Sequence, residues 1–163
     1  MRDFANPRFT RTWAARLAAA SMLTLGVAPS WAVLGGDTAT IQADQTRMRA
    51  QRQALAPVLG GSVHELRMAD GSSIRQFVNA QGVVYAVAWS TRLKPDFAQM
   101  LGRHAAEFDA GVASSPRMAG LQRRAVVDRG DLVVDSAGRP GAFVGRAWLK
   151  SLLPAGTRAD AIR

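Results

Sequence analysis

The stretch SVHELRMADGSSIRQFVNAQGVVYAVAW, residues 62–89, constrains the fold of this chain more than any other. Two similar turns, ADG and AQG, separate three runs that are rich in valine, isoleucine and aromatic residues, which is the pattern of consecutive antiparallel strands. Each turn fits a three-residue loop that ends in a left-handed glycine, so we expect positive φ at Gly71 and Gly82. The stretch therefore predicts two successive hairpins.

The loop length also predicts the register of both hairpins. The expected pairs are Glu65 with Arg75, Leu66 with Ile74 and Val63 with Phe77, then Val78 with Val84, Phe77 with Tyr85 and Arg75 with Val87. Because side chains alternate along a strand, one face would carry Leu66, Ile74, Val78, Val84, Ala86 and Ala88. The other would carry Val63, Phe77, Tyr85, Val87 and Trp89, with Glu65, Arg67 and Arg75 at its margin. The third strand is apolar on both faces, which favours a central place in the sheet.

The aromatic face is the one candidate ligand-binding surface in the sequence. Arg75 together with Phe77, Tyr85 and Trp89 could form a platform that stacks on bases or sugars. The competing interpretation is that these rings belong to the core, because aromatics on a central strand are usually buried and large exposed apolar patches are rare. We prefer the core interpretation, with the N-terminal helix or the segment 148–153 as the cover.

Two helices are expected. One covers about residues 38–55, which follow the capping residue Asp37, contain no glycine or proline and end before Pro57. The other covers about residues 95–110, where apolar side chains at spacings of three and four form a stripe suited to the alanine-bearing sheet face. Further strands are expected in LQRRAVVDRG, DLVVDSAG and GAFVGRAWL. Together these elements predict an α+β domain, with the helix at 95–110 packed on an antiparallel sheet of five or six strands.

The N-terminus has the features of a cleavable signal peptide. Four arginines precede an apolar run at residues 17–28, and small residues follow at Ser30 and Ala32. The run falls short of the roughly 20 residues that cross a bilayer, although an uncleaved anchor or a buried helix stays open as an alternative. We expect cleavage after Ala32, a mature domain of residues 33–163 without a transmembrane span, and a periplasmic or secreted location.

Charge and composition narrow the partners. Without residues 1–32 the chain keeps 17 basic and 11 acidic residues, a formal charge of +6. Arginine binds carboxylate and phosphate, so an anionic envelope component or another envelope protein is a conceivable partner, although the sequence does not identify one. Because the arginines are scattered rather than clustered, we prefer the interpretation that the charge serves solubility, and nucleic acid is not expected. Cysteine is absent, which excludes thiol catalysis and thiolate metal ligands.

No stretch of the sequence carries a catalytic or metal-binding signature. His104 and Glu107 stand three residues apart but lack further ligands, so no metal and no other cofactor is expected. The adhesion tripeptide Arg129-Gly130-Asp131 is better explained as a turn at Gly130. A histidine, an acid and a hydroxyl brought together from distant positions would still make a small periplasmic hydrolase or transferase, which is the alternative to a non-catalytic protein.

A family resemblance emerges from the order of several segments. WAVLGG, GVVYAVAW, PDFAQMLG, DLVVDSAGRPGAFVGRAWL and LLPAG follow one another in the chain. This order resembles the secreted Gram-negative family catalogued as domain of unknown function 2844, and the resemblance extends from Val33 to about Ile162. It implies an exported protein without an assigned activity and transfers no functional residues. The sequence thus predicts an exported, non-catalytic binding or envelope-interaction module.

Overall fold

The computed structural model describes residues 34–55, 61–114 and 123–163, and within them the chain forms an α+β fold around a seven-stranded antiparallel sheet. The strands are β1 (Gln51–Leu55), β2 (Ser62–Arg67), β3 (Ser73–Val78), β4 (Val84–Thr91), β5 (Arg123–Arg129), β6 (Leu132–Arg139) and β7 (Ala142–Leu149). Their order across the sheet is β1-β2-β3-β4-β7-β6-β5. The predicted signal peptide and its cleavage site lie outside the described residues.

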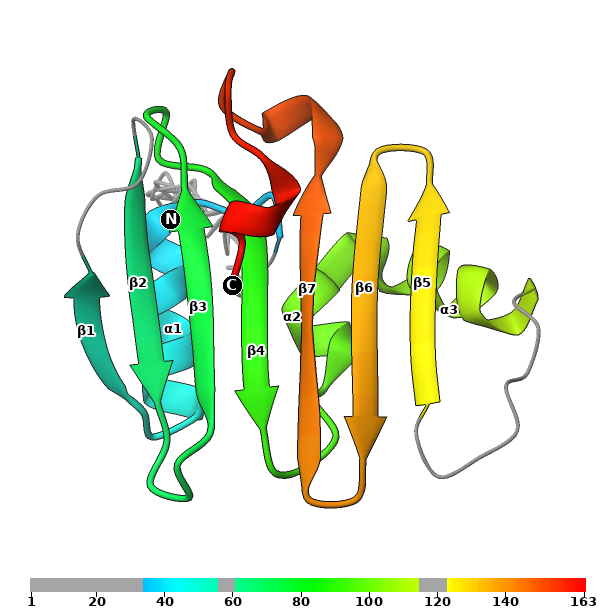
Figure 1. Ribbon diagram of the computed structural model, residues 1–163. Coiled ribbons are helices and arrows are strands. Elements are labelled where there is room, and N and C mark those ends of the chain that lie inside the picture. The colour runs from blue at the N-terminus through cyan, green and yellow to red at the C-terminus, as the bar shows by residue number, and fades with distance from the viewer. Residues whose placement is uncertain (1–33, 56–60, 115–122) are drawn as a thin grey trace, which may run out of the picture.

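The helices all lie on one face of the sheet, which we call the rear face (Figure 1). They are α1 (Thr38–Arg47), α2 (Phe97–Leu101) and α3 (Ala105–Ser114), with the 3-10 turn η1 (Gly102–His104) between the last two. The opposite, front face is crossed by the C-terminal segment, Lys150–Arg163, which contains the 3-10 turns η2 (Lys150–Leu152) and η3 (Ala159–Ala161). None of the helices in the described part of the chain is long and apolar enough to cross a membrane.

The first hairpin has the predicted register. Glu65 lies opposite Arg75 and Leu66 lies opposite Ile74. Gly71 and Gly82 have φ angles of 83° and 78°, the left-handed conformation expected for both turns. The three-residue loops were therefore correctly predicted from the position of each glycine.

The second hairpin departs from the prediction after its first pair. Val78 lies opposite Val84 as expected, but Phe77 lies opposite Ala86 instead of Tyr85. Tyr85 is the extra residue of a β-bulge, which turns two successive side chains toward the same face. The predicted faces are wrong beyond this point. Val87 and Trp89 belong to the rear core, the cluster that includes Leu101 and Phe108 of the helices. Ala86 and Ala88 belong to a second cluster on the front face, the front cluster, whose buried members are Val63, Phe77, Tyr85, Ala86, Ala88 and Ile162.

The predicted N-terminal helix is eight residues too long. The helix ends at Arg47, and Gln51–Leu55 form the edge strand β1, which raises the strand number above the expected five or six. The chain turns at Arg49, whose φ of 48° is rare for a side-chain-bearing residue. Because an arginine makes the turn that glycine usually makes, no glycine or proline marked this boundary.

The helix predicted at 95–110 is divided by Gly102, whose φ is 51°, and continues past Gly111 to Ser114. Gly111 is needed for packing, since a Cβ there would lie 2.4 Å from Val127. These helices cover the face that holds Trp89, whose ring meets Phe97 edge-on with centroids 5.6 Å apart. The expectation that they cover the alanine-bearing face is wrong, because the bulge moves the alanines to the front.

Candidate functional site

The four residues predicted as a binding platform do not form one surface. Phe77, Tyr85 and Trp89 are each less than 5% exposed, and Trp89 lies in the rear core while the other two rings lie in the front cluster. Ile162 of the C-terminal segment belongs to the same front cluster and is itself buried. Of the four, Arg75 alone keeps an accessible side chain, 38% exposed. This burial favours the core interpretation of the rings.

On the part of the front face next to the C-terminal segment, the pairing of the strands places side chains in two rows that run across the strands. The first row is Glu65, Arg75, Ala88, Arg146, Asp135 and Val126. The second row is Arg67, Ser73, Ser90, Val144, Ala137 and Arg124. Small side chains occupy the middle of the second row, with an arginine at each end.

Residues of both rows, together with the end of the C-terminal segment, line an open hollow of about 540 Å³ on the front face. Its floor includes Ala88, Ser90 and Val144, and its described lining contains four arginines, Arg75, Arg124, Arg146 and Arg163. The one acidic residue in that lining is Asp135. The hollow is therefore a positively charged depression with a floor of small side chains.

Asp135 lies between two of these arginines. The Nε and Nη2 atoms of Arg124 donate to its two carboxylate oxygens over 3.1 and 3.2 Å, which is the two-pronged geometry that arginine offers to acids. The Nη2 atom of Arg146 is 3.7 Å from the same carboxylate. Arg146 also donates through Nη1 to the Ala159 main-chain oxygen over 2.7 Å and lies over the Trp148 ring. The C-terminal segment thus helps to place Arg146 in the hollow.

On the other side of the hollow, a buried carboxylate holds Arg75. Glu65 is 1% exposed and accepts hydrogen bonds from Arg67 and, over 2.9 Å, from the Nε atom of Arg75. Burial alone would raise the pKa of Glu65, but the bonds and charges of the two arginines outweigh it and lower that pKa. Arg75 also donates through Nη1 to the main-chain oxygen of Arg163 over 2.9 Å.

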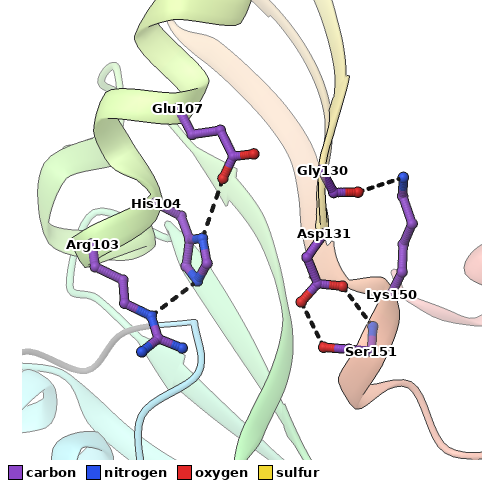
Figure 2. A network of polar contacts seen from close by, with 7 residues as sticks. All are labelled: Arg103, His104, Glu107, Gly130, Asp131, Lys150 and Ser151. Atoms are coloured by element: carbon purple, nitrogen blue, oxygen red, sulfur yellow. Dashed lines mark hydrogen bonds and ion pairs between the residues drawn. The ribbon is translucent and has the colours of Figure 1, made fainter.

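A second polar cluster joins the β5–β6 turn to the C-terminal segment (Figure 2). The Asp131 carboxylate accepts from the Ser151 main-chain nitrogen over 2.7 Å and from its hydroxyl over 2.6 Å, and the hydroxyl bond lowers the pKa of Asp131. Lys150 donates to the Gly130 oxygen over 2.9 Å. Gly130, with a φ of 53°, makes the predicted turn. Both oxygens of Asp131 are engaged, so this end of the Arg129-Gly130-Asp131 tripeptide is a structural tie rather than the solvated charge that the turn interpretation expected.

His104 stands beside this cluster without forming a catalytic arrangement with it. Its Nδ1 atom is 3.5 Å from Glu107, and its Nε2 atom accepts from Arg103 over 3.3 Å (Figure 2). Ser151 gives its hydroxyl proton to Asp131 rather than to the imidazole. Within the described ranges, no group of three or more histidine, cysteine, aspartate or glutamate side chains could hold a metal ion.

The sequence analysis identified Arg75 but missed the other charged residues of the hollow, Arg124, Asp135, Arg146 and Arg163. A signal was present, because each of the last three strands places a charged and a small or aliphatic residue two positions apart: Arg124 with Val126, Asp135 with Ala137, and Val144 with Arg146. Residues two apart share a face of a strand. Only the pairing of β4 with β7, however, brings these residues next to Arg75.

The chain matches the family described as Protein of unknown function (DUF2844) over residues 30–162. It belongs to the DUF2844 family. The resemblance seen in the order of its segments is thereby confirmed. No curated protein and no solved structure matches this DUF2844 chain.

Proposed function

We propose that this DUF2844 chain is an exported, non-catalytic module that binds an acidic component of the cell envelope in the front hollow. The observation that carries the proposal is the set of four arginines around a floor of small side chains, with a single acid among the described lining. Arginine forks match carboxylate and phosphate groups, and a shallow floor leaves room for the part of the ligand that joins its acidic groups.

The polar groups of the hollow support binding over catalysis. A hydrolase or transferase would need a base close to a hydroxyl or to bound water. The described hydroxyls of the lining are Ser73 and Ser90, and no histidine accompanies them. His64 is nearly buried between Arg52 and Ser62, and burial, followed by the charge of Arg52, lowers its pKa.

Export rests on the N-terminal sequence. The arginines, the short apolar run and the small residues Ser30 and Ala32 favour secretion and cleavage after Ala32. Mass spectrometry of the protein recovered from the periplasm or the medium should give a chain that begins at Val33. Exported protein that begins at Met1 would contradict cleavage, and protein confined to the cytoplasm would contradict export.

Binding is tested with two acidic polymers, polygalacturonate for carboxylates and long-chain polyphosphate for phosphates, and with neutral dextran as the control polymer. Arg124→Gln and Arg163→Gln should each weaken binding of the acidic polymer about threefold to tenfold at low ionic strength, and binding should fall as salt is added. Whichever acidic polymer binds more tightly indicates which acidic group the hollow prefers.

The matched control is Arg158→Gln, which removes the same charge from an arginine that is 84% exposed and is absent from the described lining of the hollow. This variant should bind as the parent does. Equal weakening by all three substitutions would mean that general charge, not the hollow, attracts the polymer. Failure of the parent protein to bind either acidic polymer would also overturn the proposal.

A further inference from the structure

The position of Asp135 has a consequence for what the hollow selects. Its carboxylate already occupies the fork of Arg124 and lies near Arg146, where an acidic group of a ligand would also bind. We infer that Asp135 is an internal competitor that makes the hollow select polymeric acids over single acidic groups. This inference rests on the proposed binding of an acidic ligand.

A ligand with one acidic group gains little from this site. To take the fork of Arg124 it must displace the Asp135 carboxylate, so one charge-assisted pair is exchanged for another. If it binds without displacing that carboxylate, the two negative charges repel each other. Asp135 is 24% exposed, so water screens this competition but does not abolish it.

A polymer has a further set of arginines to bind. Arg75 and Arg146 lie in the same row with only Ala88 between them, two strand spacings apart, so their backbones are about 10 Å from each other. Successive acidic groups of one chain can therefore meet arginines on both sides of the floor. Once one group is bound, the next binds at a high effective concentration, which compensates for the competition with Asp135.

Asp135→Asn tests the inference, because asparagine keeps the size of the side chain and an oxygen for Arg124 but removes the charge. Galacturonate is compared with polygalacturonate, and inorganic phosphate with polyphosphate, so that each pair shares one acidic group and differs in length. We expect the variant to bind the single acids about threefold to tenfold more tightly and the polymers with a smaller gain, so that the preference for polymers falls.

The matched control is Asp109→Asn, which makes the same charge change at an exposed position of α3 on the rear face. It should leave the preference for polymers as it is in the parent. If Asp135 instead only holds Arg124 in place, Asp135→Asn will weaken binding of single acids and polymers alike, and the inference is overturned. If Asp135→Asn prefers polymers over single acids as strongly as Asp109→Asn does, the inference is overturned as well.

The two proposals can fail separately. If the parent binds the acidic polymers through Arg124 and Arg163 while Asp135→Asn keeps the same preference, the inference fails and the proposed function stands. If neither the parent nor Asp135→Asn binds any acid, both fail. A thermal melt of each variant verifies that the fold is retained, so that altered binding reports on the hollow.

Discussion

The two faces of the same sheet differ in what covers them, and their side chains differ accordingly. On the rear face, β6 and β7 present Leu132, Val134, Ala147 and Leu149, all at most 1% exposed beneath the helices. Two of the front residues of these strands are the charged Asp135 and Arg146, and a third, Val144, is 49% exposed. Alternate residues of one strand thus face a buried core on one side and an open surface on the other. The positions of the helices and of the C-terminal segment, which cover parts of the sheet, therefore decide where a ligand can bind.

The bulge at Tyr85 decides on which face of the sheet the Trp89 side chain lies. Without it, Trp89 would share the front face with Arg75. With it, the Trp89 ring lies on the rear over Gly145, where a Cβ would come within 2.4 Å of the ring. The ring nitrogen is buried without a hydrogen-bond partner among the described residues, so its packing must outweigh the loss of that bond.

The largest expected effect comes from a substitution that tests the rear face. Trp89 is 4% exposed and contacts Phe97, so Trp89→Ala should lower the free energy of unfolding by about 3 to 5 kcal/mol through lost burial and a residual cavity. Val144→Ala on the exposed front should change it by about 0.5 kcal/mol or less. Urea denaturation of the three proteins measures both values.

Similar losses for Trp89→Ala and Val144→Ala would erase the distinction between a packed rear and an open front. A Trp89→Ala variant that is as stable as the parent but loses binding of acidic polymers would instead restore the aromatic platform as the ligand site. If Trp89→Ala does not fold at all, Trp89→Phe takes its place. Trp89→Phe should lose more unfolding free energy than Val144→Ala, but less than the roughly 3 to 5 kcal/mol expected for Trp89→Ala.

Local signals explain which parts of the fold were predictable. Gly71 and Gly82 mark their turns, and the loop length then sets the register of the first hairpin. The bulge has no such mark, because Tyr85 is a good strand residue in a run of good strand residues. Likewise, Arg49 turns the chain into β1 without a glycine, so a helix prediction that relied on glycine and proline extended through the strand.

The candidate site was less predictable because it is assembled from distant parts of the chain. Arg75, Arg124, Arg146 and Arg163 are scattered in the sequence, where they suggest only a diffuse charge. They converge because β4 pairs with β7 and because the C-terminal segment returns across the front. Pairing between strands more than 50 residues apart leaves no local pattern, so arginine spacing could not reveal the hollow.

The smallest expected effect concerns Glu65, the buried acid at one end of the first row. Its pKa in the folded protein is lowered by Arg67 and Arg75 despite burial, so the ionised side chain stabilises the fold above the ordinary glutamate pKa of about 4.3. That contribution is lost as the pH falls through the lowered value. Glu65→Gln should cost about 1 kcal/mol at neutral pH, because its arginine partners remain solvated, and it should narrow the stability difference between neutral pH and about pH 3.

Urea midpoints of the parent and Glu65→Gln at both pH values check this, with Asp160→Asn as a control that removes an exposed carboxylate from the C-terminal segment. If the urea midpoint falls by the same amount between neutral pH and about pH 3 in the parent and in Glu65→Gln, Glu65 is not a source of the acid sensitivity. The front face would then hold its arginines without help from a buried charge. If the stability difference between the two pH values is smaller in Glu65→Gln but not in Asp160→Asn, the ionised Glu65 side chain stabilises the front face. On the rear face, the helices provide that stabilisation.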